Sequence, residues 1–127
     1  MNRFLLVCLG GAVGTGARYL LSGWIQGAAG ATFPWGTLAV NVIGSFFLGL
    51  VMHVALTTDA LSPTMRDTLA IGVMGGFTTY SSFNYETMQS LRSGAFGLAG
   101  LYVAATLVGC LLAGFLGLAA GRALAGD

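Results

Sequence analysis

Four long apolar segments, at approximately 4–26, 36–57, 68–91 and 95–120, constrain this chain more than any other feature. Each is long enough for an α-helix to cross the hydrocarbon core of a bilayer, which takes about 20 residues. Of all side chains, 56% are hydrophobic and 7% are charged, whereas soluble domains are about 25% charged. The sequence therefore predicts an all-α membrane protein with a single four-span transmembrane domain over residues 1–127 and no soluble domain.

The composition also argues against several classes of function. A net charge of +1 leaves no basic stripe for phosphates, so we expect no nucleic-acid partner. No nucleophile–base pair or cluster of metal ligands stands out, so we expect no enzyme and no transition-metal site. Cys8 and Cys110 lie inside apolar segments, which favours two core residues over a disulfide. The first segment favours a span over a signal peptide, because the apolar stretch resumes beyond Arg18.

The distribution of arginines predicts the orientation only weakly. With four spans, Arg3, Arg66 and Arg122 share one side of the membrane and Arg92 lies on the other. Basic residues in short loops favour the cytoplasmic side, but a bias of three against one is small. The chain is therefore compatible with insertion in both orientations.

Polar side chains line one face of the second span and one face of the fourth. They recur at every fourth residue, which places them on the same side of a helix: Thr37, Asn41 and Ser45 in the second span, and Tyr102, Thr106 and Cys110 in the fourth. Small polar residues commonly bond to one another between membrane helices, and this is the simpler interpretation of any single one. Two uncharged stripes of hydroxyl and amide donors suit the passage of a small anion better than that of a cation.

The third span contains GGFTTYSSF, residues 75–83, in which two glycines precede a row of hydroxyls. We expect the glycines to open this helix at its midpoint. Backbone exposed by such a break is tolerated in a membrane only where it is buried in protein or faces a cavity. Carbonyls freed there can coordinate a cation.

Two charged residues inside the spans leave alternatives open. Arg18 could attract anions to a vestibule, or its guanidinium could extend to the membrane surface. Glu86 could modulate the mouth of a pore or its proton occupancy. It could also be a carboxylate near the interface, paired with an arginine, and we favour this second interpretation.

Three motifs in order, GARYLLS, PWGTLAVNVIGSFFLG and GGFTTYSSFNYET, give the chain a resemblance to the Fluc (CrcB-type) fluoride channel family. The resemblance covers essentially the whole chain in length, number of spans and order of motifs. It implies an antiparallel, dual-topology homodimer in the cell (inner) membrane of a prokaryote, with two fluoride pathways along the subunit interface. It also implies a central structural sodium ion, not transported, held by backbone carbonyls that belong to Gly75 and Thr78 in this sequence.

The same resemblance assigns residues to the fluoride pathway. Asn41 matches the pore asparagine of the family and Phe83 its second pore phenylalanine, while Tyr80 stands where the family generally has the first phenylalanine. Positions of the family's polar track are matched by Thr37, Tyr102 and Thr106, and Cys110 replaces a usual serine.

The chemistry of these residues agrees with a fluoride channel. Fluoride is strongly hydrated, so a pore must replace its water with donors, here the amide of Asn41 and the hydroxyls of Thr37, Thr106 and either Ser81 or Ser82. The positive ring edges of Phe83 and Tyr80 can face an anion without binding it strongly, and weak, multiple sites are what conduction needs. Hydrogen fluoride enters cells as a neutral acid and ionises inside, so a passive pore suffices to export the anion and relieve its toxicity.

Two alternatives come from other functional classes. A small multidrug-resistance exporter also has four short spans, but it needs an acidic residue in the first span, where this chain has only Arg18. A non-transporting accessory subunit would explain the glycines as packing residues. It would leave the polar stripes and the break in the third span unexplained.

Overall fold

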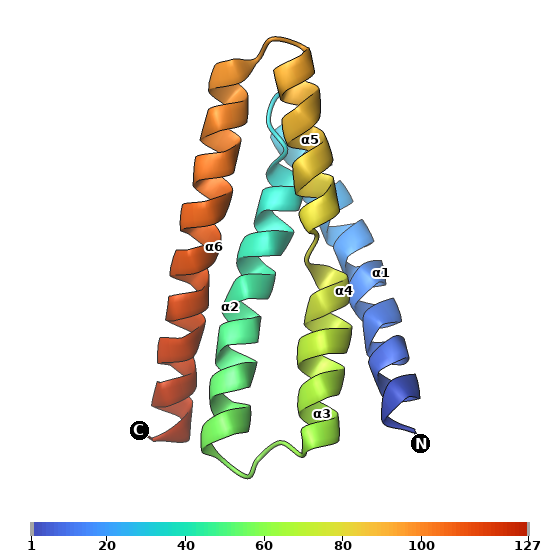
Figure 1. Cartoon of the computed structure of the whole chain (residues 1–127), viewed down its shortest axis with the longest axis vertical. Coiled ribbons are helices and arrows are strands. Elements are labelled where there is room, and N and C mark those ends of the chain that lie inside the picture. The colour runs from blue at the N-terminus through green and yellow to red at the C-terminus, as the bar shows by residue number, and fades with distance from the viewer. Residues whose placement is uncertain (1, 127) are drawn as a thin grey trace.

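The computed structural model describes residues 2–126, and all regular elements among them are helices. Three helices are long: α1 (Arg3–Ala29), α2 (Trp35–Thr57) and α6 (Phe96–Ala125). Between α2 and α6 the chain forms four shorter pieces, namely α3 (Pro63–Asp67), the π-helix η1 (Thr68–Met74), α4 (Gly75–Phe77) and α5 (Tyr80–Arg92). Figure 1 shows these four pieces following one another along the long axis of the molecule.

The three long helices are each apolar and long enough to cross a membrane. They extend the first and last predicted segments by several residues, to Ala29 and Ala125. The predicted third span, 68–91, is not one helix, because the longest piece between Pro63 and Arg92 has 13 residues. It runs beside α1 and α2 in Figure 1 as a broken helix.

Both termini and the α2–α3 loop lie at one end of the molecule, and the α1–α2 loop and the α5–α6 turn lie at the other (Figure 1). At the first end, the guanidinium groups of Arg3 and Arg66 both pair with the Asp67 carboxylate. The hydrogen bond from Arg3, followed by the bond from Arg66, holds the pKa of Asp67 below its ordinary range. These charges tie the start of α1 to the end of α3.

Glycine lets the helices approach with their backbones in contact. A Cβ on Gly14 would overlap the Val73 carbonyl of η1 and lie 3.0 Å from the Phe77 nitrogen. At Gly117 of α6, a Cβ would overlap the Phe46 carbonyl of α2. The glycines at these positions therefore allow close packing of the helices, whereas Gly16 has no atom within 4 Å of a Cβ placed there.

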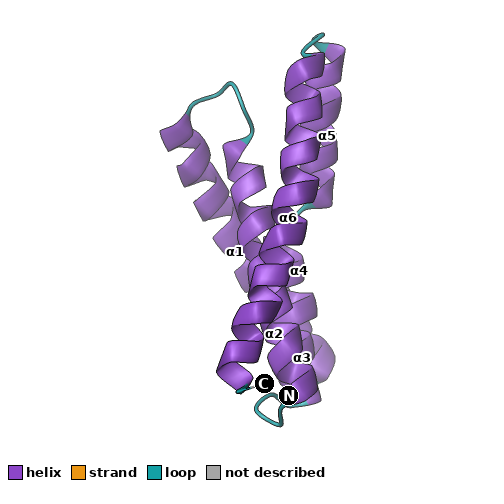
Figure 2. Ribbon diagram, turned by 90° about the vertical axis from the view of Figure 1, so that its left-hand side faces the viewer, coloured by secondary structure: helices purple, strands orange, loops and turns teal. Residues whose placement is uncertain are grey.

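The helices separate toward the end that carries the α1–α2 loop. Figure 2 shows the end of α1 and the start of α2 leaning away from α5 and the start of α6. Val40 of α2 and Tyr102 of α6 are fully buried between these helices. Many large apolar side chains on α1 and α6 are exposed, as expected for surfaces that face lipid or another chain.

Candidate functional site

The third span is broken after Phe77, and the glycines are not the break itself. Gly75 and Gly76 are helical, whereas Thr78 (φ −88°, ψ 157°) and Thr79 (φ −148°, ψ 114°) are extended. The helix is therefore broken within GGFTTYSSF and near its midpoint, as predicted, at the two threonines that follow the glycines. Gly76 instead gives room to α1, because a Cβ on it would lie 2.5 Å from the Gly11 carbonyl oxygen.

Two side chains bind the backbone groups that the break frees. The Asn41 carboxamide donates from Nδ2 to the Thr79 carbonyl at 3.0 Å and accepts from the Thr79 nitrogen at 2.7 Å. Arg18 donates from Nε to the Gly76 carbonyl at 3.0 Å, a role that neither sequence interpretation of this residue included. Because buried backbone groups need partners, Asn41 and Arg18 allow the helix to stop and restart here.

Thr79 is the N-cap of the next helix, α5. Its hydroxyl accepts from the Ser82 nitrogen at 3.2 Å, which is a standard N-cap bond. The same hydroxyl contacts the hydroxyls of Ser82, at 3.1 Å, and Ser81, at 3.3 Å. Both serines were predicted as donors along the pathway, but they lie in the first turn of α5 and line neither of the two cavities described below.

Two carbonyls at the break have no donor. Neither the Gly75 oxygen nor the Thr78 oxygen accepts a hydrogen bond from any residue within 2–126. Gly75 lies on an exposed face, and Tyr80, the first residue of α5 after the break, is 77% exposed. The Tyr80 ring packs edge-on against Phe83, with centroids 5.7 Å apart.

A second polar cluster centres on Glu86. Its Oε1 accepts from the Thr37 hydroxyl at 2.6 Å, and its Oε2 accepts from the Tyr102 hydroxyl at 3.0 Å. The expectation of an arginine partner for this carboxylate is wrong, since the ion pairs of the described residues involve Asp67. The Tyr102 ring packs edge-on against Phe83, with centroids 5.1 Å apart, so the Glu86 cluster is continuous with the break.

Two cavities flank these groups. The inner cavity, about 410 Å³, lies at the break and is lined by residues of both predicted stripes and of the third span, among them Asn41, Ser45, Thr78, Tyr80, Phe83, Thr106 and Cys110. Thr106 is 7% exposed, and its hydroxyl has no hydrogen-bond partner in the described part of the chain. The two polar stripes therefore meet around one space, and the unsatisfied hydroxyl of Thr106 is buried in its wall.

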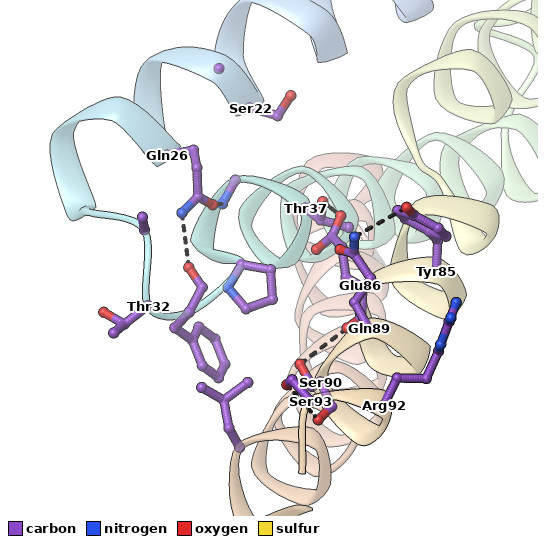
Figure 3. A pocket seen from close by; sticks show the side chains of 16 residues that line it. Ser22, Gln26, Thr32, Thr37, Tyr85, Glu86, Gln89, Ser90, Arg92 and Ser93 are labelled. Atoms are coloured by element: carbon purple, nitrogen blue, oxygen red, sulfur yellow. Dashed lines mark hydrogen bonds between the residues drawn. The ribbon is translucent and has the colours of Figure 1, made fainter. Parts of the chain in front are cut away.

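The outer cavity, about 950 Å³, lies between the α1–α2 loop and the α5–α6 turn (Figure 3). Its walls carry Thr37 and Glu86 together with Gln26, Gln89 and Arg92. Gln26 was not singled out from the sequence, and Arg92 was considered there only for the orientation of the chain. The signal for Gln26 was an amide close to the end of a long apolar segment, immediately before a loop.

This geometry can be compared with known proteins. A family model described as "CrcB-like protein, Camphor Resistance (CrcB)" matches residues 5–118. The chain belongs to the CrcB-like family. The earlier resemblance is thereby confirmed, and the family assignment does not support the multidrug exporter.

Curated relatives of this family match the chain over nearly its full length. A protein of Anaeromyxobacter sp. (strain K), named "Fluoride-specific ion channel FluC", is 56% identical over 126 residues, covering 99% of this chain and 100% of its own. One of the same name from Sorangium cellulosum (strain So ce56) is 59% identical, covering 98% of both chains. A third, from Thermus thermophilus, is 51% identical, covering 99% of this chain and 98% of its own.

Proposed function

We propose that this chain is a fluoride-specific ion channel, and not an enzyme, that exports cytoplasmic fluoride passively and so relieves its toxicity in a prokaryotic cell. The observation that carries this proposal is the identity of 56% over 126 residues with a relative named as a fluoride-specific channel. The inner cavity supports it, because its polar lining supplies uncharged donors to a small anion.

Donors at the inner cavity come from two residues. A carboxamide nitrogen carries two hydrogens, and Asn41 gives one of them to the Thr79 carbonyl, which leaves the second for the cavity that it lines. The unsatisfied hydroxyl of Thr106 is the other donor. The edge of the Phe83 ring adds a weakly positive surface, so fluoride meets several weak sites, as rapid passage requires.

The Glu86 cluster has a different part in this pathway. A hydroxyl has one hydrogen to donate, and those of Thr37 and Tyr102 point to the carboxylate. In this arrangement the two hydroxyls do not face fluoride as donors, although they occupy polar-track positions. Conduction past them requires that Glu86 release at least one hydroxyl.

We also propose that two inverted copies form an antiparallel, dual-topology dimer in the inner membrane, with four spans each and two pores at their interface. Exposure of Gly75 and of the Tyr80 ring supports it, because a break edged by an exposed aromatic ring needs cover in a membrane. Lipid surrounds the remaining apolar surface. The site in one copy is open on the side where a second copy would complete it.

A structural sodium ion fits the break. The carbonyls of Gly75 and Thr78 have no donor among the described residues, and unwound backbone carbonyls are the ligands that Na⁺ takes in membrane proteins. These two oxygens from each copy would hold the ion, which would supply a fixed positive charge beside the anion path. The ion would not be transported.

Fluoride efflux from liposomes that contain the purified protein tests the function, with chloride as the control anion. We expect fluoride to leave down its gradient without ATP or a proton gradient, and chloride to be retained. Transport of quaternary ammonium drugs without fluoride flux would contradict the proposal.

Two further measurements test the assembly. Replacing sodium by N-methylglucamine should lower the flux, and full flux from intact dimers after rigorous sodium removal would exclude the central ion. Labelling of a single cysteine placed in the C-terminal tail should occur on both sides of the cell membrane. Labelling confined to one side would exclude dual topology.

A further inference from the structure

Gln26 makes three hydrogen bonds through its carboxamide, and all of them go to the α1–α2 loop and the start of α2. Its Nε2 donates to the carbonyls of Gly30 and Phe33, at 2.5 and 2.9 Å. Its Oε1 accepts from the Gly36 nitrogen at 3.0 Å. One half-buried side chain therefore joins the last turn of α1 to both ends of the loop.

Two of the three residues that Gln26 binds, Phe33 and Gly36, lead to Glu86 from the α2 end of the loop. On one side, the Phe33 ring packs edge-on against the Tyr102 ring, with centroids 5.5 Å apart, and Tyr102 donates to the carboxylate. On the other side, Gly36 is followed directly by Thr37, which donates to the other carboxylate oxygen. Figure 3 shows Gln26 across the outer cavity from Glu86.

We infer that Gln26 is a positioning residue of the fluoride pathway, a role that rests on the proposed function. Its carboxamide holds Phe33 and the first turn of α2 in place, and these two set the positions of Tyr102 and Thr37 around Glu86. The carboxamide meets both demands here, because it carries two N–H donors and a carbonyl acceptor on one planar group. Glutamate lacks the donor, and leucine lacks both groups.

The matched control is Gln89, a second glutamine in the same cavity. Its amide donates only to the exposed Tyr85 hydroxyl, at 3.1 Å, within α5. We expect Gln26→Leu to lower fluoride efflux per assembled dimer about tenfold, by analogy with enzyme sites, where a misplacement of about 1 Å can cost about a hundredfold in rate. Gln89→Leu should stay within about twofold, as surface substitutions usually do.

A second measurement reports on the conformation of the α1–α2 loop and does not depend on fluoride transport. Trp35 packs on Phe33, with ring centroids 4.6 Å apart, and becomes the only tryptophan in a Trp24→Phe background. Gln26→Leu should raise the acrylamide quenching of Trp35, and Gln89→Leu should not. If wild-type protein moves no fluoride, the proposed function fails while this measurement still tests the positioning.

Phe33→Leu keeps the inference testable if Gln26→Leu does not fold. It leaves the backbone carbonyl that Gln26 binds but removes the ring that supports Tyr102, so flux should fall while the loop remains closed. Three results would overturn the inference: Gln26→Leu with flux within twofold of wild type, Gln26→Leu with lost flux but unchanged Trp35 quenching, or Phe33→Leu with unchanged flux. A role in stability alone predicts that the flux per assembled dimer stays constant in both variants.

Discussion

Replacing Asn41 by alanine should destabilise the fold as well as weaken conduction. The side chain is 8% exposed and binds both the nitrogen and the carbonyl of Thr79. Alanine leaves these two backbone groups unsatisfied at the break, and each such group costs about 1–3 kcal/mol. The free energy of unfolding should therefore fall by about 2–6 kcal/mol. Two average interhelical hydrogen bonds in a membrane, at about 0.6 kcal/mol each, would predict only about 1 kcal/mol.

The control is Asn84→Ala, because Asn84 is exposed on α5 and its side chain has no hydrogen bond within the described residues. Unfolding of both variants in mixed micelles, followed by tryptophan fluorescence across a denaturant series, gives the comparison. Asn84→Ala should lie within about 0.5 kcal/mol of wild type. An Asn41→Ala loss of about 1 kcal/mol or less would refute the reasoning, since Asn41 would then be an ordinary interhelical contact and not the support of the break.

Four other substitutions test three separate parts of the structure. Gly14→Ala should cost about 3 kcal/mol or more, as overpacking against backbone does, whereas Gly16→Ala, with open space around it, should be neutral or stabilising by up to about 1 kcal/mol; thermal unfolding measures both. The pKa of Asp67 lies below its ordinary 3.8 through Arg3 and Arg66, so its ion pairs stabilise the fold above that pH and are lost as the pH falls through the lowered value. The melting temperature of wild type should then drop more steeply below about pH 4 than that of Asp67→Asn, and parallel curves would contradict this. Tyr80→Phe should retain fluoride flux, because the phenol is exposed and its hydroxyl has no partner among the described residues; loss of flux would show that the hydroxyl is needed.

The sequence predicts the long helices well because their signal is local. The starts of α2 and α6 fall within a residue of the predicted segments, since hydrophobicity and the Pro34–Trp35 step act on neighbouring residues. The break lies within the predicted stretch GGFTTYSSF, at its two threonines and not at the glycines themselves. Glycine permits an opening, but the site of the opening depends on where Asn41 of another helix can reach the backbone.

The contacts of the Glu86 cluster could not be predicted in the same way. Thr37 and Glu86 are 49 positions apart. Whether the Glu86 carboxylate binds an arginine or a hydroxyl depends on how the helices pack against one another. Periodicity did place Thr37 and Tyr102 on polar faces, but it does not say which faces meet. Gln26 escaped notice because its role depends on the path of a loop, which hydropathy does not encode.

Gly75 and Gly76 are neighbours, yet they face different surroundings. A Cβ on Gly76 would strike α1 of the same chain, whereas a Cβ on Gly75 would meet nothing closer than the Ala70 oxygen at 3.9 Å. If two copies pair over the face that carries Gly75, substitutions at the two glycines should differ in their dominance over a wild-type copy. A large residue at Gly76 prevents its own chain from folding, so that chain forms no dimers and the allele should be recessive to a wild-type copy. A large residue at Gly75 leaves a folded chain that enters mixed dimers and disables them, so that allele should be dominant-negative.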